Sequence, residues 1–305
     1  MEQSEDRNWN LLPRWRAYTS IKFAKRKIQE KGLVRCLSHW FAYFIELPLA
    51  ILLWAILVAL RPLLHIRIGR LWCERLAVFA SLPEIYLCEK DARMHPRRTW
   101  DIWYHWDRDK FMLKAGYKLD SQTCNSQLDR MWRRVIHVQD AVSYLDRLNR
   151  LISPNGNAFT IPLANDADIL GLMSIYPPHI SFTDAEEELG WQKLAAMGIG
   201  KHDKFVCFHA RDSAYLESAR PRNEEKYGDW RWQDYRDSSI VAYMPAVERL
   251  AEIGYFAIRM GKVVKDRLEV ENPRIIDYAS FHHSDFMDVI RMFVKKIQTS
   301  LIILL

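Results

Sequence analysis

The strand–helix–strand pattern between residues 205 and 260 constrains the fold more than any other feature of this sequence. A short apolar run, Phe205–Phe208, is followed by a polar loop and by a helical segment that Gly254 closes. A second apolar run, Tyr255–Met260, comes next. Two strands joined through a helix are typical of a right-handed parallel unit, so the sequence predicts an α/β fold.

Three polar side chains follow the first of these strands. His209, Arg211 and Asp212 occupy the position at which open α/β sheets bind ligands, outside the carboxyl ends of the strands. The planar guanidinium of an arginine makes paired, charge-assisted hydrogen bonds to phosphate oxygens. The residues therefore predict an anion site at this edge. The alternative is a strand end capped by an ion pair of Arg211 with Asp212 or with another surface partner.

The composition limits the classes of protein to which this chain can belong. A chain of 305 residues that is 49% hydrophobic suggests about two domains with packed cores. The net charge of +6 favours anionic partners, but no helix-turn-helix, zinc-finger or stacking motif is recognisable, so we expect no nucleic-acid partner. The five scattered cysteines form no CxxC pair, which predicts no disulfide framework and a reducing, cytosolic location for the part of the chain that carries the site.

Residues 1–70 form a basic and apolar N-terminal segment. Its apolar block, Phe41–Leu60, is flanked by basic residues on both sides. Glu46 and Pro48 leave an uninterrupted apolar tract of roughly fourteen residues, shorter than the ~20 that a membrane-spanning helix needs. We therefore expect a shallow or re-entrant anchor on an anionic membrane surface. The alternative is a buried helix of the first domain.

Weaker patterns place the remaining elements. The other expected strands and helices are strands Leu82–Leu87, Asp101–Tyr104 and Arg274–Tyr278, and helices Asn125–Val138 and Asp140–Leu151. Thr183 and Glu186 form a capping box that begins a helix. Asp237 and Ser238 are expected to cap the helix that follows the polar loop.

Three segments, in this order and spacing, resemble a bacterial family of glycosyltransferases that is linked with surface polysaccharide assembly and is more distantly similar to fucosyltransferases. The segments are His209–Leu216, Tyr235–Ile240 and Ile258–Gly261, and the likeness is strongest from about Lys204 to Asp288. The resemblance implies the GT-B arrangement of two Rossmann-like domains. Residues 71–180 would form the acceptor-side domain and residues 181–305 the donor-side domain.

The resemblance also implies partners and a location. The donor would be a nucleotide-sugar and the acceptor a glycan or a lipid-linked molecule, at the cytoplasmic side of the inner membrane. His209 and Arg211 would lie beside the donor diphosphate, where an arginine stabilises the charge that develops on the leaving phosphate. Arg236, Arg259 and Gly261 would contribute to the same site. Each of these two arginines equally suits a structural ion pair, and His209 equally suits a buried ring bonded to backbone.

Two further expectations concern the chemistry of the site. Asp212 could be a catalytic residue beside Arg211 that acts as a base on an acceptor hydroxyl. The alternative is that Asp212 holds Arg211 in place through a hydrogen bond. The adjacent His282 and His283 suit a single ion badly, so we expect neither a metal nor another cofactor.

The end of the chain departs from the family pattern. After Val289 the family would continue through a strand and a small glycine- and serine-rich loop, whereas residues 290–305 are mainly apolar. This predicts an incomplete second domain that lacks the expected strand, as in a truncated or frameshifted product. The alternative is a genuine short variant in which the tail forms a final helix. The alternative functional interpretation is an inactive remnant that acts only as a membrane-associated binding protein.

Overall fold

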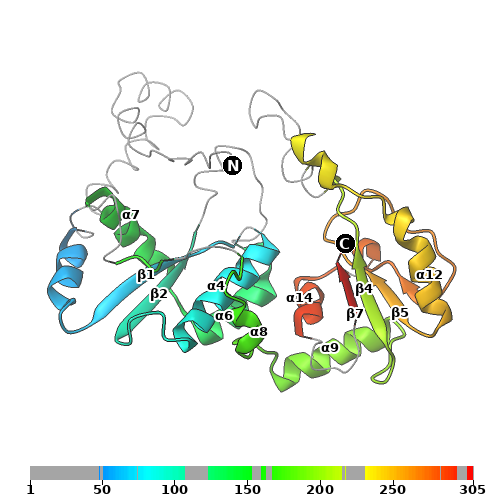
Figure 1. The fold of residues 1–305 in the computed structure, drawn as a ribbon, viewed down its shortest axis with the longest axis horizontal. Helices are drawn as coiled ribbons and strands as arrows, with labels where there is room; N and C mark the ends of the chain where they lie inside the picture. Colours follow the sequence, from blue (N-terminus) through cyan, green and yellow to red (C-terminus); the bar gives the residue numbers. More distant parts are fainter. Residues whose placement is uncertain are drawn as a thin grey trace, which may run out of the picture. The chain divides into compact units, whose positions relative to one another are not determined.

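Two small parallel sheets organise the protein in the computed structural model (Figure 1). The structure describes residues 48, 51–73, 75–106, 123–152, 159–162, 167–214, 217, 231–281, 283–293 and 301–304. The first sheet has the order β1 (His65–Leu71), β2 (Thr99–His105), β3 (His137–Val138). The second has the order β6 (Ile275–Ile276), β5 (Phe256–Arg259), β4 (Phe205–His209), β7 (Leu301–Leu304). Every pairing between these strands is parallel, which confirms the mixed α/β class.

Helices connect the strands of both sheets. They are α4 (Leu76–Asp91), α6 (Ser126–Val135), α7 (Ser143–Ile152), α8 (Leu172–Ile175), α9 (Asp184–Ala196), α12 (Met244–Glu252), α13 (Tyr278–Phe281) and α14 (Asp285–Phe293). The short 3-10 helices η2 (Asp140–Val142), η3 (Arg231–Arg236) and η4 (Ile240–Tyr243) join them. The capping box of Thr183 and Glu186 is present at the start of α9, which confirms that prediction.

In each sheet, the strand that comes first in the chain has later strands or bridges on both of its sides. β5 and β6 extend the second sheet on one side of β4, and β7 pairs with β4 on the other. In the first sheet, β2 and β3 lie on one side of β1, while Ile68 forms a parallel bridge with Thr160 on the other. Such a reversal in a parallel sheet is a topological switch point, beside which open α/β sheets bind ligands.

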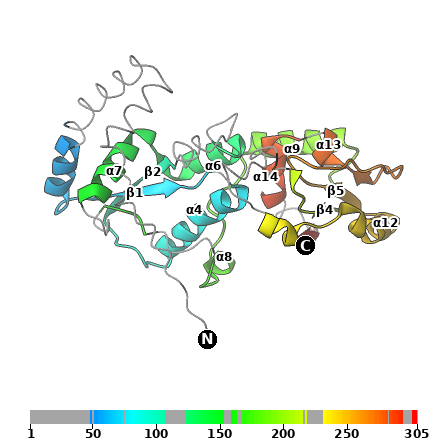
Figure 2. The same cartoon turned by 90° about the horizontal axis from the view of Figure 1, so that it is seen from above.

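Both faces of the second sheet are covered. Phe205 and Cys207 point into a core with α9, α13 and α14, whereas Val206 and Phe208 point into a core with α12. Figure 2 shows α9 and α13 on one side of β4 and β5, with α12 on the other. Because side chains alternate along a strand, a strand covered on both faces must be apolar throughout, as the run Phe205–Phe208 is.

The core of the first sheet is built from large aromatic residues. Trp103 of β2 and Trp132 of α6 are almost completely buried and belong to one apolar cluster. Gly69 of β1 permits this packing, because a Cβ atom there would lie 2.6 Å from Cε3 of Trp103. Beside the cluster, the buried Arg67 pairs with Asp101 at 2.8 Å across the two strands.

Two sequence predictions are wrong at the level of elements. Leu82–Leu87 lies inside the helix α4 and is not a strand. A short apolar run does not by itself distinguish a buried strand from a buried helix segment. The expected caps of the helix after the polar loop are also wrong. The cap is Ser239, whose hydroxyl accepts a hydrogen bond from the Val241 amide at the start of η4. Neither Asp237 nor Ser238 is the cap of this segment. The strands expected at 101–104, 205–208 and 255–260 are confirmed as β2, β4 and β5.

The boundaries at both ends of the folded part also differ from expectation. β1 begins at His65, inside the stretch 1–70 that the sequence assigned to the N-terminal segment. The expectation that the chain ends without a further strand is wrong, because β7 pairs with β4 in the register of Leu304 to His209. Both sheets belong to one compact unit of residues 64–143 and 156–305, so the division near residue 180 stays a prediction.

The helical residues 51–60 are the described part of the predicted membrane segment. Most of their apolar side chains are exposed, with Leu52 at 58% and Ile51 at 48% of full accessibility. The basic stretch before them lies outside the described residues. None of the helices in the described part of the chain combines the length and apolarity that crossing a bilayer requires.

Candidate functional site

The candidate site lies at the C-terminal edge of β4, at the switch point of the second sheet. β4 ends at His209, and Ala210, Arg211 and Asp212 continue from it between the ends of β5 and β7. The C-terminal ends of parallel strands share one edge, so the loops after β4 and β5 meet here. The residues that the sequence singled out after β4 are therefore placed together by the sheet.

Arg211 is partly exposed and paired. Its Nη1 atom lies 3.2 Å from Oδ1 of Asp237, and the two side chains retain 26% and 24% of their accessible surface. The carbonyl of Arg211 accepts a hydrogen bond of 2.8 Å from the Ser238 amide, which fixes the segment after η3 beside the strand end. Asp237, expected as a helix cap, forms this ion pair instead.

Asp212 holds two loops together. Its Oδ1 atom accepts from the backbone amide of Ala214 at 3.0 Å, and its Oδ2 atom accepts from the amide of Lys265 at 3.0 Å. The first bond closes a local turn, and the second ties the loop after β5 to the loop after β4. Both carboxylate oxygens are thus engaged by backbone, whereas Arg211 pairs with Asp237.

His209 is fixed by the strand next to it. Its Nδ1 atom donates to the carbonyl oxygen of Met260 at 3.0 Å. In the neutral ring this bond selects the tautomer with the proton on Nδ1, which makes Nε2 an acceptor. Gly261 follows directly, and a Cβ there would lie 2.8 Å from Cγ1 of Val264. The glycine therefore lets the loop after β5 turn closely at the site.

The remaining two predicted arginines differ in environment. Arg259 is 2% exposed; its Nη1 atom donates to the Asp266 carbonyl at 2.7 Å and lies 3.4 Å from Oδ2 of Asp277. Arg259 therefore forms a structural ion pair, because its guanidinium is enclosed by the loop that follows β5. Arg236 is exposed at the end of η3, on the chain that leads into Asp237.

A second charged cluster, absent from the sequence prediction, lies at the corresponding end of β2. The Nε2 atom of buried His105 is 2.7 Å from Asp129, and its Nδ1 atom is 3.0 Å from Asp140. Burial alone would lower the pKa of His105, but the hydrogen bonds and charges of the two aspartates outweigh it and raise the pKa. The ring therefore bridges α6 and η2. The only sequence signal was its position at the end of a strand.

Side chains able to ligate a metal gather in two places among the described residues. Glu84, Cys88 and His179 present ligand atoms within 4.8 Å of one another, and so do His283, Asp285 and Asp288. In the second group, Nε2 of His283 is 3.0 Å from Asp288. Asp285 of that group accepts from Ser126, so its carboxylate joins two helices.

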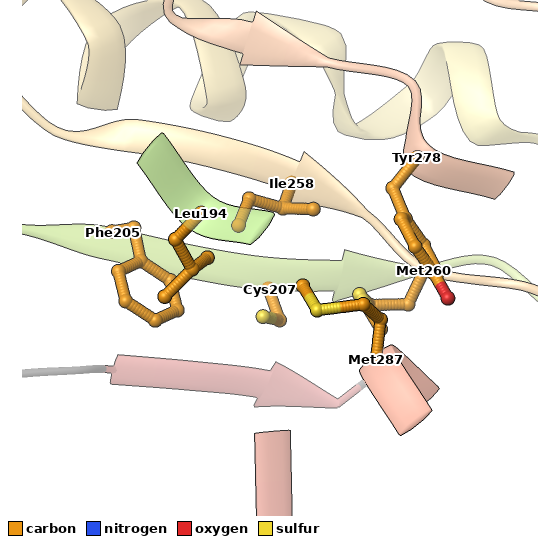
Figure 3. Close-up of a pocket in the computed structure, with 7 residues that line it drawn as sticks. All are labelled: Leu194, Phe205, Cys207, Ile258, Met260, Tyr278 and Met287. Carbon is orange, nitrogen blue, oxygen red and sulfur yellow. The ribbon is translucent and has the colours of Figure 1, made fainter. Parts of the chain in front are cut away.

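A small void under β4 and β5 is part of the core. It is lined by apolar residues, including Leu194 of α9, Cys207 of β4 and Met287 of α14 (Figure 3). It offers about 10 Å³ to a water-sized sphere, which is room for no more than about one water. The hydroxyl of Tyr278, at its border, donates to the Ser284 carbonyl at 3.0 Å. The void is therefore no ligand site.

Comparisons with known proteins give no identity. No family model matches the chain, and no match was found among curated proteins or among solved structures. The resemblance to the glycosyltransferase family stays a prediction from the segments that carry it.

Proposed function

We propose that this protein transfers a sugar from a nucleotide-sugar donor to a glycan or lipid-linked acceptor, with the donor diphosphate bound at the C-terminal edge of β4. One observation carries the proposal: Arg211, partly exposed and held by Asp237, stands where the strand order of a parallel sheet reverses. Anionic cofactors and substrates bind at such switch points in doubly wound folds.

The chemistry of sugar transfer suits this arrangement. Breaking the bond between sugar and diphosphate builds negative charge on the leaving phosphate, and a guanidinium oriented in advance stabilises that charge without reorganisation. Asp237 supplies the orientation. His209, fixed through Nδ1, offers Nε2 to a donor hydroxyl, and the exposed Arg236 adds positive charge nearby in the chain.

Asp212 is best regarded as a positioning residue. Its carboxylate bonds the amides of Ala214 and Lys265, so it shapes the two loops around Arg211. Arg259 stays outside the proposed site because its guanidinium is buried.

The strand orders support the finer fold proposal of two Rossmann-like halves. The order β6-β5-β4-β7 corresponds to 3-2-1-4, the first part of the Rossmann order. The bridge from Ile68 to Thr160 extends the first sheet in the same sense beyond β1. We further propose that residues 51–60 bind an anionic membrane on its cytoplasmic side, supported by their exposed apolar side chains.

Donor binding tests the function. We expect titration of the purified protein with a panel of nucleotide-sugars to identify a ligand, and Arg211→Ala to weaken its binding roughly 10- to 150-fold, the effect of losing a hydrogen bond to a charged group. Arg249→Ala, which removes an exposed arginine paired with Glu252, serves as the matched control and leaves affinity unchanged.

Three outcomes would argue against the proposal. Absence of binding and hydrolysis across the whole panel rejects the transferase. Vesicle binding that persists in Arg211→Ala, together with that absence, supports the inactive membrane-associated alternative. If wild type and Arg211→Ala bind the donor with equal affinity, the donor site does not lie at the end of β4.

A further inference from the structure

The ligating side chains Glu84 and Cys88 lie on one face of α4. They are four positions apart, which places them one above the other on a helix. Asp91 continues the same face by a further turn. Both Glu84 and Cys88 are buried, at 7% and 0% exposure. A buried carboxylate and a buried thiol therefore lie on the same helix face, and the half-exposed Asp91 follows them along the helix.

His179 covers this face from a distant part of the chain. Its Nδ1 atom lies 3.0 Å from Oε1 of Glu84, and its Nε2 atom lies 3.1 Å from Oδ2 of Asp91. Its backbone amide also donates to Glu84 at 3.1 Å. Pro177 and Pro178 precede it and restrict the chain that carries the ring. His179 is thus held over α4 by two contacts of its ring and one of its backbone amide.

From this arrangement we propose a binding site for a divalent transition metal, of the zinc type, formed by Glu84, Cys88 and His179. Thiolate, imidazole and carboxylate are the ligands that Zn²⁺ takes in proteins. Ligand atoms around a tetrahedral zinc lie roughly 3.2–3.8 Å apart, given its bond lengths. Here the three ligand atoms lie within 4.8 Å of one another, so closure by about 1 Å completes the site.

The contact with Asp91 has a defined part in this site. When Nδ1 of His179 binds the metal, its Nε2 proton stays hydrogen-bonded to Asp91. A carboxylate in this position fixes the ring and raises the basicity of the ligating nitrogen. Asp91 is about half exposed. One coordination position is left for solvent.

Proton release balances the formation of the site. The bond between the metal and the Cys88 sulfur forms as the thiol gives its proton to solvent. Because no oxidation occurs, the site needs no co-reactant.

The site stands apart from the residues proposed for donor binding. All of its ligands come from α4 and the segment before α9, whereas the proposed donor site follows β4. Metal binding and donor binding are therefore tested by separate measurements, and either one can fail without the other.

Cobalt provides the direct test, with full-length protein freed of metal by a chelator. We expect Co²⁺ to bind one ion per chain and to produce the near-ultraviolet charge-transfer band of a thiolate ligand, which Zn²⁺ then abolishes. Cys88→Ser removes the band. Cys207→Ser, at a buried cysteine of β4, is the matched control and retains it.

Two further variants keep the test decisive if Cys88→Ser does not fold. His179→Ala, at a partly exposed side chain, weakens Co²⁺ binding more than about a hundredfold, and Asp91→Asn weakens it about 10- to 100-fold. Zn²⁺ raises the Tm of wild type and leaves that of His179→Ala unchanged. Wild type without the thiolate band, or variants at Cys88 and His179 that bind as wild type does, would overturn the proposal.

Discussion

Arg211 and Arg259 show how two arginines at neighbouring strand ends acquire different roles. Both follow or end an apolar strand, and both suit phosphate binding in sequence. Arg259 is enclosed with Asp277 and the Asp266 carbonyl, whereas Arg211 retains a quarter of its surface beside Asp237. Burial separates them, because a guanidinium reaches a ligand only if the protein has not already enclosed it.

The first prediction follows from this difference. Arg259→Leu should lower the free energy of unfolding by about 3–5 kcal/mol, because it leaves the carboxylate of Asp277 buried without its cation. Arg211→Ala should lower it by less than about 1 kcal/mol, since its ion pair is partly exposed. Urea unfolding measures both. Equal losses for the two variants would contradict the assignment of Arg259 as structural.

The junction between α6 and α9 shows a contact at the scale of elements. The Glu186 carboxylate accepts from Gln127 at 2.6 Å and from Arg134 at 3.0 Å, both on α6, while it caps α9 through the Thr183 amide. Burial opposes ionisation, but these bonds prevail and lower the pKa of Glu186 to about 2. A single side chain therefore completes a cap and joins two helices.

A pH dependence follows from this carboxylate. Because its folded pKa is lowered, the stability that it contributes is present above its ordinary pKa of 4.5 and is lost as pH falls towards 2. Glu186→Gln should therefore lower the unfolding free energy by about 1–3 kcal/mol at neutral pH, and the difference should shrink below about pH 4. Glu187→Gln, at an exposed residue of the same turn, is the control. Urea denaturation across pH measures it, and a difference independent of pH would contradict this explanation.

At the scale of the whole molecule, α14 links segments that are far apart in the sequence. The Asp285 carboxylate accepts from the amide and the hydroxyl of Ser126 at 2.8 Å each, at the start of α6. Asn125 donates to the Asp285 carbonyl at 2.7 Å. Further along α14, Val289 is fully buried in the core that contains Trp132. The helix near the end of the chain therefore completes the core of the first sheet.

The corresponding prediction concerns Asp285. Asp285→Ala should lower the free energy of unfolding by about 1–3 kcal/mol, because the amide and the hydroxyl of Ser126 at the start of α6 lose the carboxylate that accepts from them. Asp184→Ala, in the exposed first turn of α9, is the matched control and should have a smaller effect. Thermal unfolding followed by circular dichroism measures both. Similar losses would show that Asp285 acts only through its own helix.

Much of the second sheet was predictable from local patterns. Phe205–Phe208 and Tyr255–Met260 are apolar because both faces of β4 and β5 are covered, and this burial appears directly as an uninterrupted apolar run. The capping box at Thr183 was recognisable because both of its partners lie within one turn. The helix α4 was mistaken in part for a strand, because its residues are buried nearly all round and show no clear period.

By itself, the sequence determined the α/β class, the strands β4 and β5, and the gathering of His209, Arg211 and Asp212 at a strand end, because these depend on neighbours in the chain. Only the tertiary structure decided that Asp237 pairs with Arg211, that Arg259 is enclosed, and that β7 adds beside β4. It also brought His179 over α4. These contacts join residues far apart in sequence, and no local pattern records them, because their energy arises only once the core has placed both partners.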